Sequence, residues 1–120
     1  MRTKHYNRTN AVAYAHKWAL GRNHQYYDFD HIGGDCTNFA SQVLYAGSDV
    51  MNPKPTFGWY YYNLYNRAPA WTSVEFLYRF LTNNQEIGPV AVKTDISQVS
   101  PGDIVQLSFD GESFVHSPVV

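Results

Sequence analysis

Apolar residues recur with the spacing of one helix face in three stretches of the chain, and they alternate with polar residues only near its end. The first stretch predicts a helix from about residue 9 to residue 20. Asn7 or Thr9 is suited to cap the start of this helix, and Gly21 is suited to end it. The predicted buried stripe has the spacing i, i+3, i+4 and i+7 and consists of Ala11, Tyr14, Ala15 and Trp18.

The second stretch predicts a helix from about residue 36 to residue 46. Asp35 is the predicted N-cap, because a short polar side chain there accepts free backbone N–H groups, and Gly47 is the predicted stop. The predicted buried face of this helix consists of Cys36, Ala40, Val43 and Gly47.

The following stretch, 48–70, combines prolines with many aromatic residues and is predicted to be irregular. A third helix is predicted to begin at Thr72, since Thr72 and Glu75 have the spacing of a capping box. Its predicted buried stripe consists of Val74, Leu77, Tyr78 and Leu81.

Strands are predicted in the last third of the chain. The segment 90–94 has the composition of a strand, and 104–109 alternates apolar with polar residues. Asp110-Gly111 is typical of a hairpin turn, and the returning strand carries His116. Helices followed by an antiparallel meander predict an α+β fold.

Composition narrows the class of protein. The chain has 120 residues, of which 44% are hydrophobic and 16% charged, as expected of one small globular domain. The formal net charge of −1 gives no reason to expect a nucleic acid or an anionic membrane as partner. No apolar run approaches the roughly 20 residues of a membrane helix, and the first residues lack the pattern of a signal peptide.

The chain contains a single cysteine, Cys36, so neither an intramolecular disulfide nor a zinc site with several thiolates is expected. Most free cysteines are small buried core residues. Cys36, however, follows Gly33-Gly34 at the predicted start of a helix, where backbone N–H groups favour a thiolate and an oxyanion. From these features alone, two interpretations of Cys36 stay open: a catalytic nucleophile and a structural core residue.

A nucleophilic cysteine needs a base, and the chain offers five histidines. His31 is close to Cys36 in sequence, whereas His116 lies on a predicted strand, which is the more rigid position. The alternative for His116 is a half-exposed strand residue without a catalytic role.

Five segments in order then resemble a known family: "DCTNFASQVLYAG", "WYY", "APAWTSVEFLYRFL", "SPGDIVQL" and "FVHSPVV". The chain resembles the putative amidase domain of Gram-positive bacteria from residue 6 to residue 120. That domain belongs to the papain-like cysteine peptidases and amidases, with the NlpC/P60 and CHAP cell-wall hydrolases. The resemblance implies an α+β, papain-like (NlpC/P60-like) fold with N-terminal helices packed on a small antiparallel sheet.

The resemblance also implies roles for individual residues. Cys36 matches the nucleophile and His116 the general base, while Asp35 and Asn38 match positions that support the oxyanion site or the helix start. For Asp35 and Asn38, a purely local role in the first helical turn is the alternative. A groove wall is expected from three aromatic residues, for which core packing is the alternative: Trp59, Tyr60 and Trp71.

The function implied is hydrolysis of an amide bond in a peptide or peptidoglycan-type substrate, with no cofactor, at an extracellular or cell-wall location. A catalytically inactive peptide- or cell-wall-binding module with the same fold is the alternative, and a purely structural helical domain is a third. Papain-like sites usually carry a third polar residue on the strand after the histidine. Residues 1–120 hold no such position, so we expect a single, C-terminally truncated domain. Its open sheet edge would permit strand exchange or self-association, and Pro118 would interrupt the strand of His116.

Overall fold

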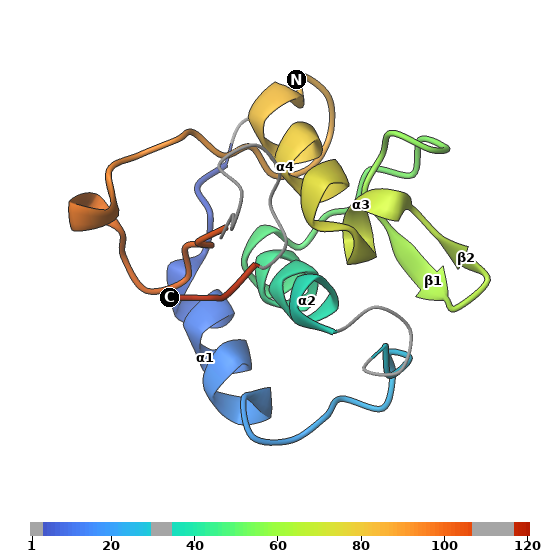
Figure 1. Cartoon of the computed structure of the whole chain (residues 1–120), viewed down its shortest axis with the longest axis horizontal. Helices are drawn as coiled ribbons and strands as arrows, with labels where there is room; N and C mark the ends of the chain where they lie inside the picture. The colour runs from blue at the N-terminus through green and yellow to red at the C-terminus, as the bar shows by residue number, and fades with distance from the viewer. Residues whose placement is uncertain (1–3, 30–34, 107–116) are drawn as a thin grey trace.

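The computed structural model describes residues 4–29, 35–106 and 117–120 (Figure 1). Within these ranges the regular elements are four α-helices, one 3₁₀ helix and one two-stranded antiparallel sheet. In chain order they are α1 (Arg8–Trp18), α2 (Cys36–Ser48), β1 (Tyr61–Asn63), β2 (Asn66–Arg67), α3 (Pro69–Thr72), α4 (Val74–Asn83) and η1 (Ile96–Gln98).

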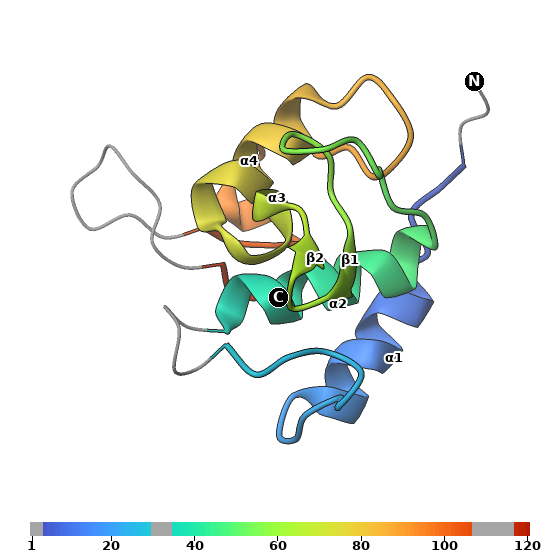
Figure 2. The same ribbon diagram turned by 90° about the vertical axis from the view of Figure 1, so that its right-hand side faces the viewer.

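Helix α2 is the centre of the molecule. It packs against α1 and against α3, and α3 in turn packs against α4. Figures 1 and 2, related by a quarter turn, both show α2 between α1 on one side and α3 with α4 on the other. Consistent with this position, most residues of α2 are buried, including polar ones such as Thr37, Asn38 and Ser41.

The core next to α2 is largely aromatic. Trp59 and Trp71 are fully buried, with their ring centroids 4.8 Å apart, and Phe80 stacks on Trp59 at 6.0 Å. Such large rings bury much apolar area per residue, which allows a chain of this size to form a core. The high aromatic content of the sequence therefore serves packing first.

The predicted helix starts are correct to within two residues. Asn7 caps α1, because its side chain accepts the backbone N–H of Asn10 at 3.0 Å. Helix α4 begins after Ser73 rather than at Thr72: the Ser73 side chain accepts the N–H of Phe76, and its extended backbone separates α4 from the short turn of α3.

The prediction that Gly47 ends the second helix is wrong. Helix α2 continues to Ser48, and the left-handed residue that follows the helix is Asp49, with φ of 59°. Gly47 has a packing role instead: a Cβ at this position would lie 2.3 Å from the ring of Tyr6. The absence of a side chain lets the segment before α1 lie directly on α2, where the N–H of Asn7 donates to the Gly47 carbonyl at 2.8 Å.

The strand predictions hold in part. The stretch expected to be irregular contains the β1–β2 hairpin, and 90–94 is an exposed segment that the structure does not assign to a strand. Near the end of the chain, Ile104 pairs antiparallel with Val119, as an antiparallel return requires. Pro118 takes part through its carbonyl, which accepts the N–H of Val105 at 2.9 Å. The predicted turn at Asp110-Gly111 lies outside the described residues.

The described elements are thus helices with a small antiparallel sheet, and the papain-like arrangement of a larger sheet stays a prediction. Among the described residues, no helix has the length and apolar character needed to cross a lipid bilayer.

Candidate functional site

Cys36 is the first residue of α2 and is only partly buried. Its sulfur lies 3.8 Å from the Thr37 hydroxyl oxygen. The first N–H groups of an α-helix have no partner within the helix, so a thiol at this end lies in a field that favours negative charge. A partly exposed thiol at a helix start has the access and the setting that a nucleophile needs.

Asp35 precedes α2, but its carboxylate does not cap the helix through a side-chain hydrogen bond. One carboxylate oxygen accepts the backbone N–H of Phe29 at 3.1 Å and the Asn38 amide at 2.9 Å. The other accepts a guanidinium N–H of Arg22 at 3.0 Å. The predicted N-cap contact is therefore wrong, and Asp35 instead fastens the preceding segment to the start of α2.

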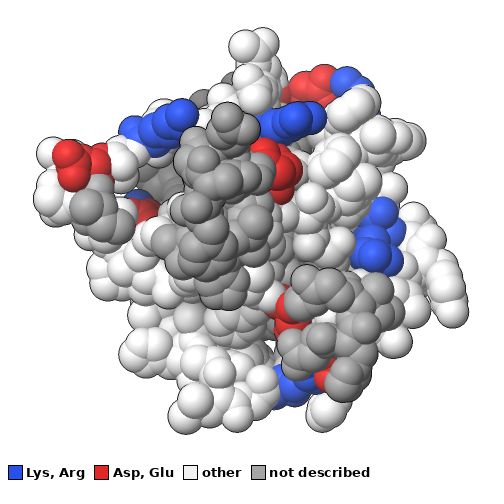
Figure 3. Space-filling model, in the orientation of Figure 1, with Lys and Arg blue, Asp and Glu red and all other residues white. Residues whose placement is uncertain are grey.

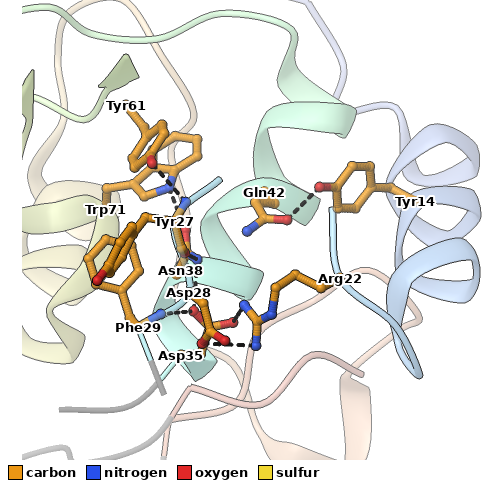
Figure 4. A network of polar contacts seen from close by, with 10 residues as sticks. All are labelled: Tyr14, Arg22, Tyr27, Asp28, Phe29, Asp35, Asn38, Gln42, Tyr61 and Trp71. Carbon is orange, nitrogen blue, oxygen red and sulfur yellow. Dashed lines mark hydrogen bonds and ion pairs between the residues drawn. The ribbon is translucent and has the colours of Figure 1, made fainter. Parts of the chain in front are cut away.

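Arg22 links two carboxylates beside the start of α2. One of its terminal nitrogens lies 3.0 Å from Asp35 and the other 3.1 Å from Asp28 (Figure 4). All three side chains are partly exposed, so the strength of these ion pairs is limited by solvent. Their geometric effect is to hold segment 22–29 alongside the helix that begins with Cys36.

Asn38 lies on the buried side of the same helical turn. Its carbonyl oxygen accepts the indole N–H of Trp71 at 3.0 Å, and its amide nitrogen donates to Asp35 and to the Tyr27 carbonyl (Figure 4). The amide is nearly inaccessible and its donors are engaged. These contacts fit the local role in the first helical turn that was the alternative for Asn38, and its part in an oxyanion site stays a prediction.

A contact that the sequence did not predict joins the start of α2 to the last residues of the chain. The Thr37 hydroxyl donates to the Ser117 hydroxyl oxygen at 3.2 Å, and both side chains are buried. The Gln106 amide nitrogen lies 3.4 Å from the same Ser117 oxygen and 3.2 Å from the Val74 carbonyl. The only sequence signal for this cluster was the position of Ser117 directly after His116.

His116 itself lies outside the described residues, as do His31 and the Gly33-Gly34 pair. The remaining histidines are all exposed: His5, His16 and His24. Within the described ranges, no group of three or more His, Cys, Asp or Glu side chains is placed to hold a metal ion.

The expected groove wall is not formed by the two tryptophans. Trp59 and Trp71 have no exposed surface, because both rings lie between α2 and α4 in the core. Tyr60 is partly exposed and stacks on Tyr62 with ring centroids 5.3 Å apart. For the tryptophans, the alternative of core packing is the observed one.

A shallow hollow of about 400 Å³ does lie on the hairpin side of segment 22–29. Tyr27 and Tyr62, both substantially exposed, lie in its wall, and Arg22 and Asp28 connect it to Asp35. Tyr26 lies there too, and burial raises the pKa of its phenol to about 12. In Figure 3, acidic and basic groups are interspersed over the coloured and white part of the face, in keeping with the small net charge.

Comparison with known proteins bears on this site. The family model described as "Putative amidase domain" matches residues 5–120. The uncharacterized protein YhbB of Bacillus subtilis (strain 168) is 33% identical over 119 residues, which cover 96% of this chain and 37% of that relative. The chain thus spans less than half of that relative's length. No solved structure matches this chain. Because the family match extends over nearly the whole sequence, the chain belongs to the family of the Putative amidase domain.

Proposed function

We propose that this amidase domain hydrolyses amide bonds through a thiolate–imidazole pair formed by Cys36 and His116. The family supports a hydrolase that acts on C–N bonds. The position of Cys36 at the start of α2 supports its role as the nucleophile, since helix N–H groups favour a thiolate there.

The observation that carries the proposal is the hydrogen bond between Thr37 and Ser117. These residues directly follow Cys36 and His116 in the sequence, and consecutive Cα atoms are separated by about 3.8 Å. A buried contact between the two following residues therefore requires the two backbone segments that carry the pair to approach each other. Residues 80 positions apart do not meet in this way by local chain geometry.

The chemistry follows from such a pair. The imidazole of His116 takes the thiol proton, and the thiolate attacks the carbonyl carbon of the amide. The backbone N–H of Cys36 stabilises the oxyanion, a contribution of about 3–4 kcal/mol per donor in oxyanion holes. The imidazolium then gives its proton to the leaving amine, and water, deprotonated by the same imidazole, hydrolyses the thioester to release the acid and the thiol.

Peptides of the peptidoglycan type are the substrates we propose, at an extracellular or cell-wall location. The hollow beside segment 22–29 supports a peptide substrate, because exposed tyrosines supply amphipathic contact area next to Arg22 and Asp28. The site as proposed uses no cofactor and no metal ion.

The test is amide hydrolysis by three variants of the chain. Purified peptidoglycan is the substrate, and newly released amino groups are counted after labelling. We expect Cys36→Ala to abolish turnover and His116→Ala to lower it by about 10²-fold or more, the usual contribution of a general base. His16→Ala is the matched control, since His16 is an exposed histidine on α1, and it should leave turnover unchanged.

Circular dichroism of each variant checks that the fold is retained. Turnover that survives Cys36→Ala in a folded variant would contradict the proposal. Binding of peptidoglycan without release of amino groups by the unmodified chain would instead favour the binding module.

A further inference from the structure

A second hollow, of about 360 Å³, lies between helix α4 and the loop of residues 52–58. Figure 2 shows this loop, which connects α2 to β1, next to α4. The hollow shares no lining residue with the one beside segment 22–29, and none of its lining residues belongs to α2. It is therefore separate from the candidate amidase site.

The base of the loop is held tightly. Asn52 and Trp59 exchange two backbone hydrogen bonds of 2.8 Å, and the N–H of Gly58 donates to the Lys54 carbonyl at 2.9 Å. The Asn52 side chain also accepts the N–H of Lys54 at 3.0 Å. A Cβ at Gly58 would lie 2.3 Å from the Lys54 carbonyl oxygen, so only glycine fits this crossing of the chain.

The tip of the loop is strained. The N–H of Phe57 donates to the carbonyl of Pro55 at 2.8 Å, and Thr56 between them has φ of 67°. This combination is a classic γ-turn, which is rare, and a positive φ is uncommon for a β-branched residue. Strain of this kind is concentrated at functional sites. Its result here is that the ring of Phe57 is 68% exposed at the hollow instead of joining the core.

Helix α4 supplies the opposite wall. The four residues of α4 that line the hollow have the spacing i, i+3, i+4 and i+7 of one helix face: Phe76, Arg79, Phe80 and Asn83. The two phenylalanines pack toward the core and give this wall an apolar surface, whereas Arg79 is exposed. Within the described residues, the guanidinium of Arg79 forms no ion pair.

The charges around the hollow favour a ligand with a single negative group. Lys54 and Glu86 form an ion pair at 3.5 Å, so Arg79 is the one lining residue whose charge is not compensated. A guanidinium matches a carboxylate, which it binds through two parallel hydrogen bonds. A nucleic acid or another polyanion would require several cations, which this hollow does not offer.

We propose that this hollow binds a peptide segment that carries a carboxylate group. Arg79 binds the carboxylate, and the rings of Phe57 and Phe76 contact an apolar side chain of the same peptide. The exposed amides of Asn83 and Gln85 also line the hollow and can form hydrogen bonds with the peptide backbone. Binding here does not require amide hydrolysis, because none of these residues takes part in the proposed reaction.

The test is a titration of the ¹⁵N-labelled chain with N-acetyl-Phe-Glu-amide, followed through the backbone N–H signals. At millimolar concentrations of this peptide we expect saturable shifts at the hollow, including those of Phe57, Gly58 and Arg79. N-acetyl-Phe-Gln-amide has the same shape without the charge. It should bind about tenfold more weakly or worse, because it lacks the charge-assisted hydrogen bonds.

Two variants assign the contacts. Arg79→Met should lower the affinity for the Glu peptide by about tenfold and remove the preference for Glu over Gln. Phe57→Ser should weaken both peptides by the same factor, because it removes apolar contact and no charge. Both residues are exposed, so circular dichroism should show a retained fold. Lys4→Met, which removes an exposed positive charge outside the hollow, is the matched control and should bind as the unmodified chain does.

Three results would overturn the inference. The first is the absence of saturable shifts at the hollow, and the second is equal affinity of the unmodified chain for the Glu and Gln peptides. The third is inorganic phosphate binding at these residues as tightly as the Glu peptide, since that would show a site for a bare anion. Each result leaves the roles of Cys36 and His116 to their own test.

Discussion

At the scale of single residues, the polar positions around Cys36 form one buried chain of hydrogen bonds along α2. The indole of Trp59 donates to Ser41, Ser41 donates to the Trp71 carbonyl, and the Trp71 indole donates to Asn38. Asn38 in turn donates to Asp35, which precedes Cys36. These side chains connect the aromatic core to the first turn of the helix and so hold the start of α2, where the proposed nucleophile lies.

Asn38→Leu tests this connection. The substitution leaves the Trp71 indole N–H without its acceptor and removes one donor from Asp35, in a position that is almost inaccessible to water. We expect the free energy of unfolding to fall by about 2–3 kcal/mol, as for a buried polar group left unpaired. Urea denaturation measures this change in the free energy of unfolding. Asn83→Leu, at an exposed residue of α4, is the control and should stay within about 0.5 kcal/mol. A loss no greater than the control's would contradict the proposed role of Asn38.

Sequence reasoning was most successful here for residues whose role depends on local structure. Cys36 stands at the start of its helix as predicted, because the glycines, the aspartate and the following apolar period are all local signals. The contact of Thr37 with Ser117 joins residues 80 positions apart, and neither side chain has a local pattern that identifies its partner. The hollow between α4 and the loop of residues 52–58 is likewise visible only once the surrounding atoms are placed.

At the scale of elements, the crossing of α2 with the segment before α1 depends on Gly47. Helix propensity alone predicts that Gly47→Ala stabilises α2, by about 1 kcal/mol. The new Cβ, however, would lie 2.3 Å from the Tyr6 ring, which is held by its own hydrogen bond to the Gly102 carbonyl at 3.0 Å. Because the ring cannot move without losing that bond, the steric cost exceeds the gain in propensity.

We therefore expect Gly47→Ala to lower the free energy of unfolding by about 1–3 kcal/mol, the usual range for overpacking. Gly21→Ala is the matched control, since nothing lies within 4 Å of a Cβ there. Thermal unfolding followed by circular dichroism compares the two variants. A Tyr6→Ala background should reduce the effect of Gly47→Ala. A stabilised Gly47→Ala variant would show that the packing account of this glycine is wrong.

Helices α1, α2 and α4 were predictable because each has an apolar period of several turns, whereas the four residues of α3 are too few to show one. The β1–β2 hairpin was not, since strands of three and two residues are too short for a period to be recognised. The opposite error occurred at 90–94, where valines favour a strand but the segment is exposed and pairs with no strand that the structure describes. A high β-propensity does not form a strand when no partner strand is available for pairing.

At the scale of the whole molecule, segments near both ends of the described chain bind the same two residues, Gly102 and Asp103. The Tyr6 hydroxyl donates to Gly102, and Arg8 forms an ion pair with Asp103 at 2.7 Å. The backbone of Asp103 then pairs with that of Val120, at the C-terminus. Residues 102 and 103 thereby link the segment around the start of α1 to the C-terminal residue.

Two tyrosines make the stability of this closed molecule sensitive to alkaline pH. Burial raises the pKa of Tyr6 to about 12, although Arg8 opposes the rise, and burial raises the pKa of Tyr26 to about 12 as well. These pKa values exceed the value of about 10 in the unfolded chain. The contribution of the two protonated phenols to the free energy of unfolding is therefore complete below about pH 10, and it is lost as the pH rises from about 10 to 12. Urea denaturation between about pH 8 and pH 11.5 should show a progressive decrease in the free energy of unfolding.

Tyr6→Phe and Tyr26→Phe should each make that decrease shallower. Tyr65→Phe is the control, because Tyr65 is 94% exposed, and it should reproduce the pH dependence of the unmodified chain. A decrease that is the same in all of these variants would mean that other groups cause the alkaline instability.

The most direct test of the account is the pH dependence of Cys36 alkylation by iodoacetamide, with and without His116. Cys36 is the only cysteine, so the reaction reports on this one thiol. The account predicts rapid alkylation well below about pH 8 in the unmodified chain. It also predicts that His116→Ala, with its fold retained, shifts the reaction toward the range of an ordinary thiol, near pH 8.5. Identical profiles for the two chains, both typical of an ordinary thiol, would contradict a proton shared between Cys36 and His116.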